Sequence, residues 1–186
     1  MASDKQFSPE KVFAWLFLAT EVMFFSGLIG AYIVLRSAAS SWPDPQARLA
    51  VDITAFNTFV LITSSWLMVR ALFAAHKGDR GGILRWLGLT IMGGSIFVGI
   101  QVYEYIELYK HGSLPKVDIF WSTFYVMTGF HGTHVIVGVL WLIAVWFKAA
   151  RGGYTAKDSL GVELAGLYWH FVDLVWVLLF TIVYLF

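Results

Sequence analysis

Residues 119–147 read IFWSTFYVMTGFHGTHVIVGVLWLIAVWF, a run without a single lysine, arginine, aspartate or glutamate. About 20 helical residues cross the roughly 30 Å hydrocarbon core of a bilayer, so this run is long enough to span a membrane. The chain has four further apolar stretches of sufficient length: residues 11–36, 52–75, 84–109 and 161–186. The sequence therefore predicts an all-α bundle of five transmembrane helices, with residues 1–186 forming a single domain.

Composition supports the membrane assignment and excludes several chemistries. Hydrophobic residues make up 59% of the chain and charged residues 13%, a balance that favours lipid over water. The formal net charge of +1 gives no indication of a nucleic-acid partner. The absence of cysteine excludes disulfides, zinc–thiolate sites and iron–sulfur clusters.

Lysines and arginines near the predicted span ends predict the orientation of the chain. Nine of them lie on the side of the N-terminus and four on the other side, namely Arg36, Arg48, Lys110 and Lys116. Positively charged residues concentrate in cytoplasmic connections. The bias predicts a cytoplasmic N-terminus and, after five crossings, an external C-terminus.

Glu21 lies near the middle of the first predicted span. An ionised carboxylate exposed to lipid there costs several kcal/mol, so we expect Glu21 to be protonated, paired or facing a wet cavity. Two interpretations follow: a hydrogen bond that fastens one helix to another, or a functional carboxylate.

Histidines and an aspartate repeat a spacing of three on the last two spans. His131 and His134 share a face of the fourth span, and His170 and Asp173 share a face of the fifth. Such faces either bind a metal ion or connect helices. No Glu-x-x-His motif of the di-iron carboxylate proteins is present.

Depth along the helices suggests which polar residues meet. At about 1.5 Å per residue, Glu21 lies roughly 15 Å from the cytoplasmic end of its span, His170 roughly 14 Å and His134 roughly 20 Å. These three side chains can share one layer in the inner half of the membrane. Gln101 and Glu104 share a face near the external end of the third span, where we expect a solvated rim.

Lys148 and Arg151 lie at the cytoplasmic end of the fourth span. They help to set the orientation of the chain in the membrane, and basic residues at this depth also suit binding of a phospholipid headgroup.

The motifs together resemble subunit III of the haem-copper oxidases over nearly the whole chain. They are TEVMFF (20–25), AFNT (55–58), AH (75–76), QVYEY (101–105), TGFHGTHV (128–135) and YWHFVDLVW (168–176). The resemblance implies an accessory subunit of a respiratory terminal oxidase, which reduces oxygen to water and pumps protons. It implies as partners the catalytic subunit I, subunit II and phospholipids, in the inner (cytoplasmic) membrane of a bacterium.

The resemblance also implies roles for individual residues. Glu21 matches the family's intramembrane glutamate on a lipid-lined cleft, and Glu163 matches the acid that precedes the last-helix motif. His131, His134, His170 and Asp173 match buried polar positions, and Lys148 and Arg151 match basic residues near a lipid phosphate. Subunit III carries no haem or copper in this family, so we expect no cofactor on this chain apart from structural phospholipid.

One departure from the family pattern affects the lipid cleft. Longer members have seven spans, and this chain begins at what resembles their third. The two missing helices form one arm of the lipid cleft, so we expect the cleft to be open here or closed by another subunit. The five-span members include quinol oxidase subunits, some bacterial cytochrome oxidase subunits and an accessory protein linked to nitric oxide reductase. Two hypotheses of other classes remain open: a haem- or metal-binding redox enzyme using His131, His134 and His170, and a proton or ion transporter using Glu21.

Overall fold

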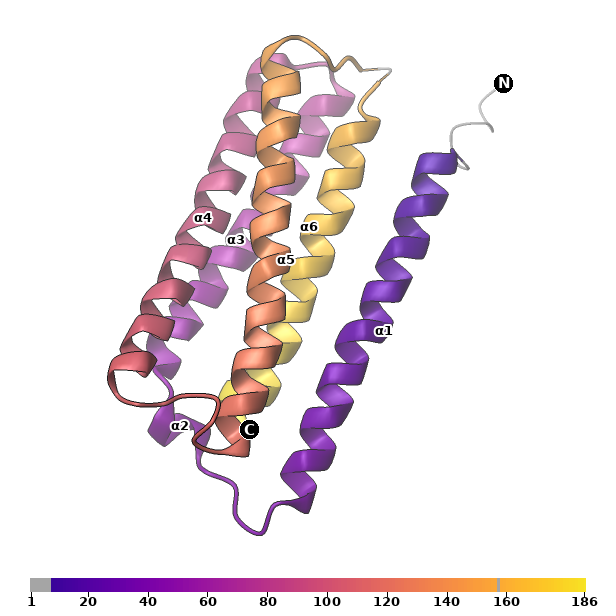
Figure 1. Cartoon of the computed structure of the whole chain (residues 1–186). Helices are drawn as coiled ribbons and strands as arrows, with labels where there is room; N and C mark the ends of the chain where they lie inside the picture. The colour runs from indigo at the N-terminus through magenta and orange to yellow at the C-terminus, as the bar shows by residue number, and fades with distance from the viewer. Residues whose placement is uncertain (1–7, 157) are drawn as a thin grey trace.

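The computed structural model describes residues 8–156 and 158–186, most of them in five long helices. These are α1 (Pro9–Ala38), α3 (Val51–His76), α4 (Arg80–Lys110), α5 (Ile119–Ala150) and α6 (Leu160–Phe180), each long and apolar enough to cross a membrane (Figure 1). A short π-helix, η1 (Thr181–Leu185), continues α6. The prediction of five spans is confirmed, with ends shifted by at most four residues when η1 is counted with α6.

Two features of the chain fall outside that prediction. The short helix α2 (Pro45–Arg48) lies in the first connection, where the sequence predicts only a turn. The orientation stays a prediction, and two of the lysines that support it, Lys5 and Lys157, lie outside the described residues.

Side-chain caps fix where three of the helices begin. Ser8, Asp79 and Asp118 each stand at the N-cap position, and each accepts a hydrogen bond from a backbone N–H in the first turn of its helix. The distances from the Asp79 and Asp118 carboxylates to these N–H groups are 3.0 and 2.9 Å. Such bonds satisfy donors that the helix itself leaves unpaired.

Glycines in the left-handed conformation end three of the helices. Gly78, Gly112 and Gly152 follow α3, α4 and α5 with φ angles of 69°, 74° and 77°. In each case the next N–H bonds back to a carbonyl five residues earlier, as from Gly153 to Lys148 at 3.0 Å. This is the Schellman arrangement, which satisfies the last carbonyls of a helix and favours glycine because a Cβ is strained there.

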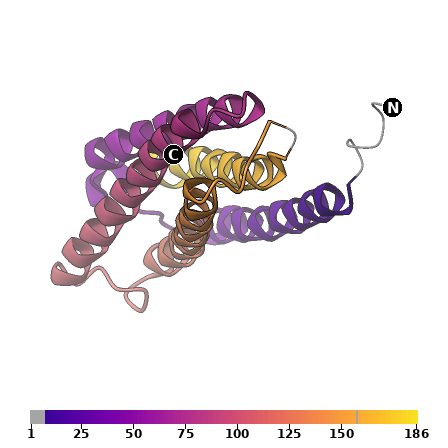
Figure 2. The ribbon, with the colours of Figure 1, turned by 90° about the horizontal axis from the view of Figure 1, so that it is seen from above.

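Helices α3, α4, α5 and α6 form a four-helix bundle, and α1 runs along its outside, next to α5 and α6 (Figures 1 and 2). The buried side chains of α1 are Leu18, Phe25 and Tyr32, which repeat every seven residues and form one narrow stripe. Most of the α1 surface is therefore left to lipid or to another protein.

Small residues let α6 approach its neighbours closely. The ring of Trp169 is fully buried beside Gly94 of α4 and Gly138 of α5. A Cβ at Gly94 would collide with the ring, and one at Gly138 would lie 3.0 Å from it. The indole N–H donates to Ser64 of α3 at 3.1 Å, so this one side chain connects all four helices of the bundle.

We predict that Gly152→Ala destabilises the protein by about 1 kcal/mol, because alanine is strained at positive φ. No atom lies within 4 Å of the added Cβ, so the loss is conformational rather than steric. Gly99→Ala in α4 is the matched control, since its Cβ also meets nothing within 4 Å and its φ is helical. Thermal unfolding in detergent measures both, and equal melting temperatures would contradict the assignment.

Candidate functional site

Glu21 of α1 and His134 of α5 form a pair inside the membrane-spanning region. Glu21 Oε2 lies 3.0 Å from His134 Nε2, and each side chain is 18% exposed. The other ring nitrogen, His134 Nδ1, lies 2.7 Å from the carbonyl oxygen of Phe130. A carbonyl oxygen only accepts, so Nδ1 carries a hydrogen and donates it.

This tautomer determines how many protons lie between the His134 ring and the Glu21 carboxyl group. With Nδ1 protonated, the bond between Nε2 and Oε2 contains one proton, either on an imidazolium facing a carboxylate or on a carboxylic acid facing a neutral imidazole. Both arrangements have zero net charge, so the pair avoids an unpaired ion in the low-dielectric interior. Glu21 is thereby a helix fastener that also holds a proton.

Aromatic rings enclose this pair on the α1–α5 side. The His134 ring lies 5.1 Å from the ring centroid of Phe25 and 6.3 Å from that of Phe24. The hydroxyl of Tyr168 on α6 donates to the backbone carbonyl of His134 at 3.0 Å. Three helices therefore converge on the pair and fix the position of the imidazole.

His170 does not join Glu21 and His134. Its Nδ1 lies 2.6 Å from the hydroxyl of Ser65 on α3, so His170 connects α6 to α3. Asp173, one turn further along α6, interacts with the same Ser65 side chain. The predicted layer is thus divided: one polar pair fastens α1 to α5, and a second polar group fastens α6 to α3.

His131 lies in the centre of the four-helix bundle. It is fully buried, and neither ring nitrogen has a hydrogen-bond partner among the described residues. Its ring stacks on Trp176 at 4.9 Å and meets the edge of Phe97 at 5.9 Å. His131 and His134 both contact the ring of Phe25 on α1, but residues 8–156 and 158–186 contain no group of three His, Asp or Glu side chains placed to hold a metal ion.

Glu104 and Gln101 are buried, so the expectation of a solvated rim is wrong. The Glu104 carboxylate accepts hydrogen bonds from the Tyr184 hydroxyl at 3.1 Å and from the Thr54 hydroxyl at 3.3 Å. Tyr184 lies on the π-helix η1, which carries the chain end over this part of α4. The Gln101 amide donates to the carbonyl of Thr128 at 3.2 Å.

Basic and acidic side chains at the other end of the bundle mostly bond within the chain. Lys11 of α1 pairs with Glu163 of α6 at 2.7 Å, a second attachment for α1. The Lys148 ammonium lies 4.5 Å from the centroid of the Tyr154 ring, so it contacts its own connection. Arg151 is exposed.

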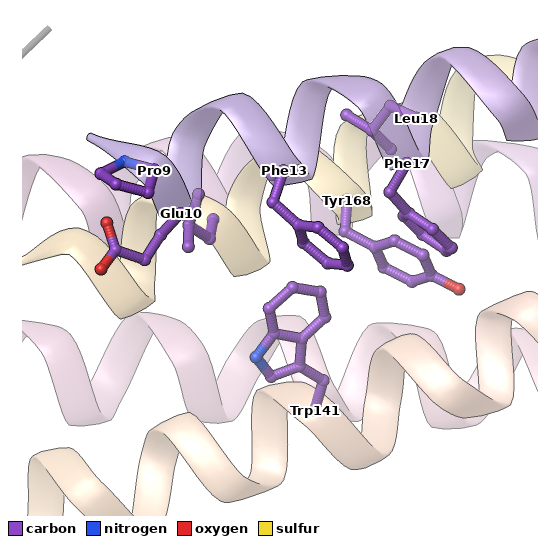
Figure 3. A pocket seen from close by; sticks show the side chains of 9 residues that line it. Pro9, Glu10, Phe13, Phe17, Leu18, Trp141 and Tyr168 are labelled. Atoms are coloured by element: carbon purple, nitrogen blue, oxygen red, sulfur yellow. The ribbon is translucent and has the colours of Figure 1, made fainter. Parts of the chain in front are cut away.

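Two apolar grooves run along opposite sides of α1. The first, of about 570 Å³, lies between α1, α5 and α6, where Phe13 and Phe17 face Trp141 and Tyr168, with Glu10 at one end (Figure 3). The second, of about 640 Å³, lies between α1 and α6 and includes His170. Both grooves suit long hydrocarbon chains rather than polar ligands.

The fold and these contacts define an all-helical, multi-pass membrane protein whose intramembrane polar side chains connect its own helices. The family model described as cytochrome c oxidase subunit III matches residues 10–186. The chain belongs to this family, and hence to the subunits of multi-subunit haem-copper oxidase complexes.

Bacterial relatives from cytochrome c oxidases and from a quinol oxidase support the same conclusion. The chain is 39% identical over 171 residues to cytochrome c oxidase subunit 3 of Thermostichus vulcanus, covering 91% of this chain and 84% of that protein. It is 41% identical over 172 residues to the corresponding subunit of Synechocystis sp., covering 91% and 72%. It is 33% identical over 171 residues to quinol oxidase subunit 3 of Bacillus subtilis, covering 92% and 84%.

We predict that Glu21 and His134 are energetically coupled by about 2 kcal/mol in a double-mutant cycle of Glu21→Gln and His134→Gln. Each single change leaves the other side chain of the pair, which is partly buried, without its natural partner. The double change removes both members of the pair. The measurement is the free energy of unfolding of the full chain in detergent. The exposed pair Glu107–Lys110 is the control and should show no measurable coupling; additivity at Glu21 and His134 would contradict the pairing.

Proposed function

We propose that this chain is a non-catalytic accessory subunit of a respiratory haem-copper terminal oxidase. In this role it stabilises the catalytic subunit, binds phospholipid and supports proton uptake during oxygen reduction. We place it in the bacterial inner (cytoplasmic) membrane with its N-terminus in the cytoplasm, bound to subunits I and II. The observation that carries the proposal is the family match over residues 10–186 together with the Glu21–His134 pair.

Phospholipid binding is supported by the two grooves beside α1. Their linings are almost entirely apolar, and aromatic rings such as Phe13, Phe17 and Trp141 offer flat surfaces for acyl chains. Because α1 has one narrow buried stripe, lipid in these grooves would fill space that protein leaves open. Structural phospholipid would then hold α1 against the bundle in addition to its two polar attachments.

Support of proton uptake rests on the properties of the Glu21–His134 pair. The pair holds one proton between two titratable groups, and it lies between helices rather than in the bundle centre. A proton held next to a lipid-filled groove is available to a neighbouring subunit that takes protons from the same side of the membrane. Glu21 in this proposal positions a proton and carries out no bond chemistry of oxygen.

Haems and copper belong on the partner subunits in this proposal. On this chain the most buried histidine, His131, directs its ring against Trp176 and Phe97, while His134 and His170 already bond Glu21 and Ser65. The electron donor, cytochrome c or quinol, would act on those partners too, in keeping with relatives of both names.

The test is the Glu21→Gln variant in the purified complex, isolated in a mild detergent through a tag on this chain. We predict a large haem-containing partner in both forms, with unchanged haem absorption. Initial oxygen consumption should be nearly intact, whereas the number of turnovers before inactivation should fall several-fold, because the shared proton is lost. Asp52→Asn, an exposed acid at the start of α3, is the control and should leave both quantities unchanged.

Two outcomes would contradict the proposal. Recovery of the chain as a free protein without a haem-containing partner would exclude the subunit role. Immediate and total loss of oxygen reduction in a fully assembled Glu21→Gln complex would place Glu21 in the catalytic path itself.

A further inference from the structure

Two arginines and two tryptophans gather on the side of the bundle opposite α1. Arg70 and Trp66 belong to α3, and Arg85 and Trp86 to α4, the two helices furthest from α1 (Figure 2). The guanidinium carbon of Arg70 lies 5.0 Å from the centroid of the Trp86 ring, and that of Arg85 lies 5.2 Å from the same centroid. The two guanidinium carbons are therefore no more than about 10 Å apart, by the triangle inequality on these two distances.

These two positive charges have no acidic partner among the described residues. Neither arginine takes part in an ion pair, and their contacts are with the Trp66 and Trp86 rings. Between residues 59 and 93 the sequence contains one acid, Asp79, and its carboxylate caps α4. Two like charges held close together, with no acid beside them, favour the binding of an anion.

The depth of the cluster points to the headgroup region of a bilayer. Arg70 lies six residues before the end of α3 and Arg85 five residues after the start of α4, which is about 9 and 8 Å along the helix axes. Long arginine side chains reach the interface from such positions, and tryptophan concentrates at the same level. Trp66 is 56% exposed and its ring packs edge-on against Trp86 at 6.2 Å, so the cluster opens outward.

Below the arginines the surface is apolar. Ile62 and Phe59 lie one and two turns further from the end of α3 than Trp66, on the same exposed face. An acyl chain can lie along this face while its phosphate stands between the two guanidinium groups. Arginine suits this task because its planar fork donates two hydrogen bonds to one phosphate.

We propose that Arg70, Arg85, Trp66 and Trp86 form a binding site for the phosphate of an anionic phospholipid. The site is separate from the grooves beside α1 and does not rest on the oxidase role. The site is specific for a headgroup of net negative charge. A zwitterionic headgroup would bring its own positive charge close to the two guanidinium groups, which would repel it.

The test is native mass spectrometry of the full chain titrated with phosphatidylglycerol, with phosphatidylcholine as the zwitterionic comparison. Arg70→Gln together with Arg85→Gln should weaken phosphatidylglycerol binding about 30-fold, because each basic residue near a membrane surface contributes about fivefold. Arg70→Lys with Arg85→Lys should lose less, since the charge remains and only the fork is lost. Phosphatidylcholine binding should change little in all variants.

The matched control is Lys110→Gln with Lys116→Gln, which removes the same charge at the other end of the bundle and should leave phosphatidylglycerol binding unchanged. The proposed site would be overturned if this control lost as much phosphatidylglycerol affinity as the arginine double variant. It would also be overturned if the arginine double variant bound phosphatidylglycerol within twofold of the unchanged chain.

A protein partner is the remaining alternative occupant. If carboxylates of a neighbouring subunit bind the arginines, the double glutamine variant will lose subunits from the purified complex but bind phosphatidylglycerol as tightly as before. That result would also overturn the proposal. Intact complexes with weakened lipid binding support it.

Discussion

A bilayer offers no water to a polar side chain inside it, so a polar group in these helices is favoured where it finds a partner within the protein; the fully buried His131 is an exception among the described residues. This constraint explains the inter-helix hydrogen bonds of the bundle. Trp169 donates to Ser64, Trp176 donates to Thr58 at 2.9 Å, and His170 bonds Ser65. All three bonds join α6 to α3. Polar side chains thus determine which helices pack together, because an apolar side chain contacts lipid about as favourably as it contacts a neighbouring helix.

The same constraint gives α1 its distinct place. It is apolar and lies outside the bundle, with one narrow stripe of buried residues. Its polar attachments to α5 and α6 are the Glu21–His134 pair in the membrane and the Lys11–Glu163 pair near one end. At the other end Arg36 bonds the backbone carbonyl of Phe186. A helix held at a few points with grooves on either side is suited to exchange contacts with lipid and with a neighbouring subunit.

The sequence was sufficient for the five spans because each is a long, predominantly apolar run between breaks rich in glycine, proline and charge. Depth grouped Glu21, His134 and His170 in one layer, but it did not show that Glu21 pairs with His134. The partner of His170 did not follow, because depth along a helix gives no rotation about its axis. Ser65 could have been found only from the buried face of α3.

Glu104 shows a second limit of sequence reasoning. Its position near a span end indicated contact with water, yet Tyr184 and Thr54 enclose its carboxylate. The last turn of the chain is a π-helix, and the resulting placement of Tyr184 depends on packing that no local pattern encodes. The helix α2 escaped prediction for a similar reason, since four residues carry too little periodicity to be recognised.

The central claim is that Glu21 and His134 share one proton and so join α1 to the bundle without net charge. Solid-state NMR of the full chain in lipid, with ¹⁵N-labelled histidine, tests it most directly at neutral pH. The account predicts a hydrogen on His134 Nδ1 bonded to the Phe130 carbonyl, and one proton between Nε2 and the Glu21 carboxyl group, with the Nε2 signal altered by Glu21→Gln. An unprotonated Nδ1, or an ionised Glu21 beside a neutral imidazole with no proton between them, would contradict it.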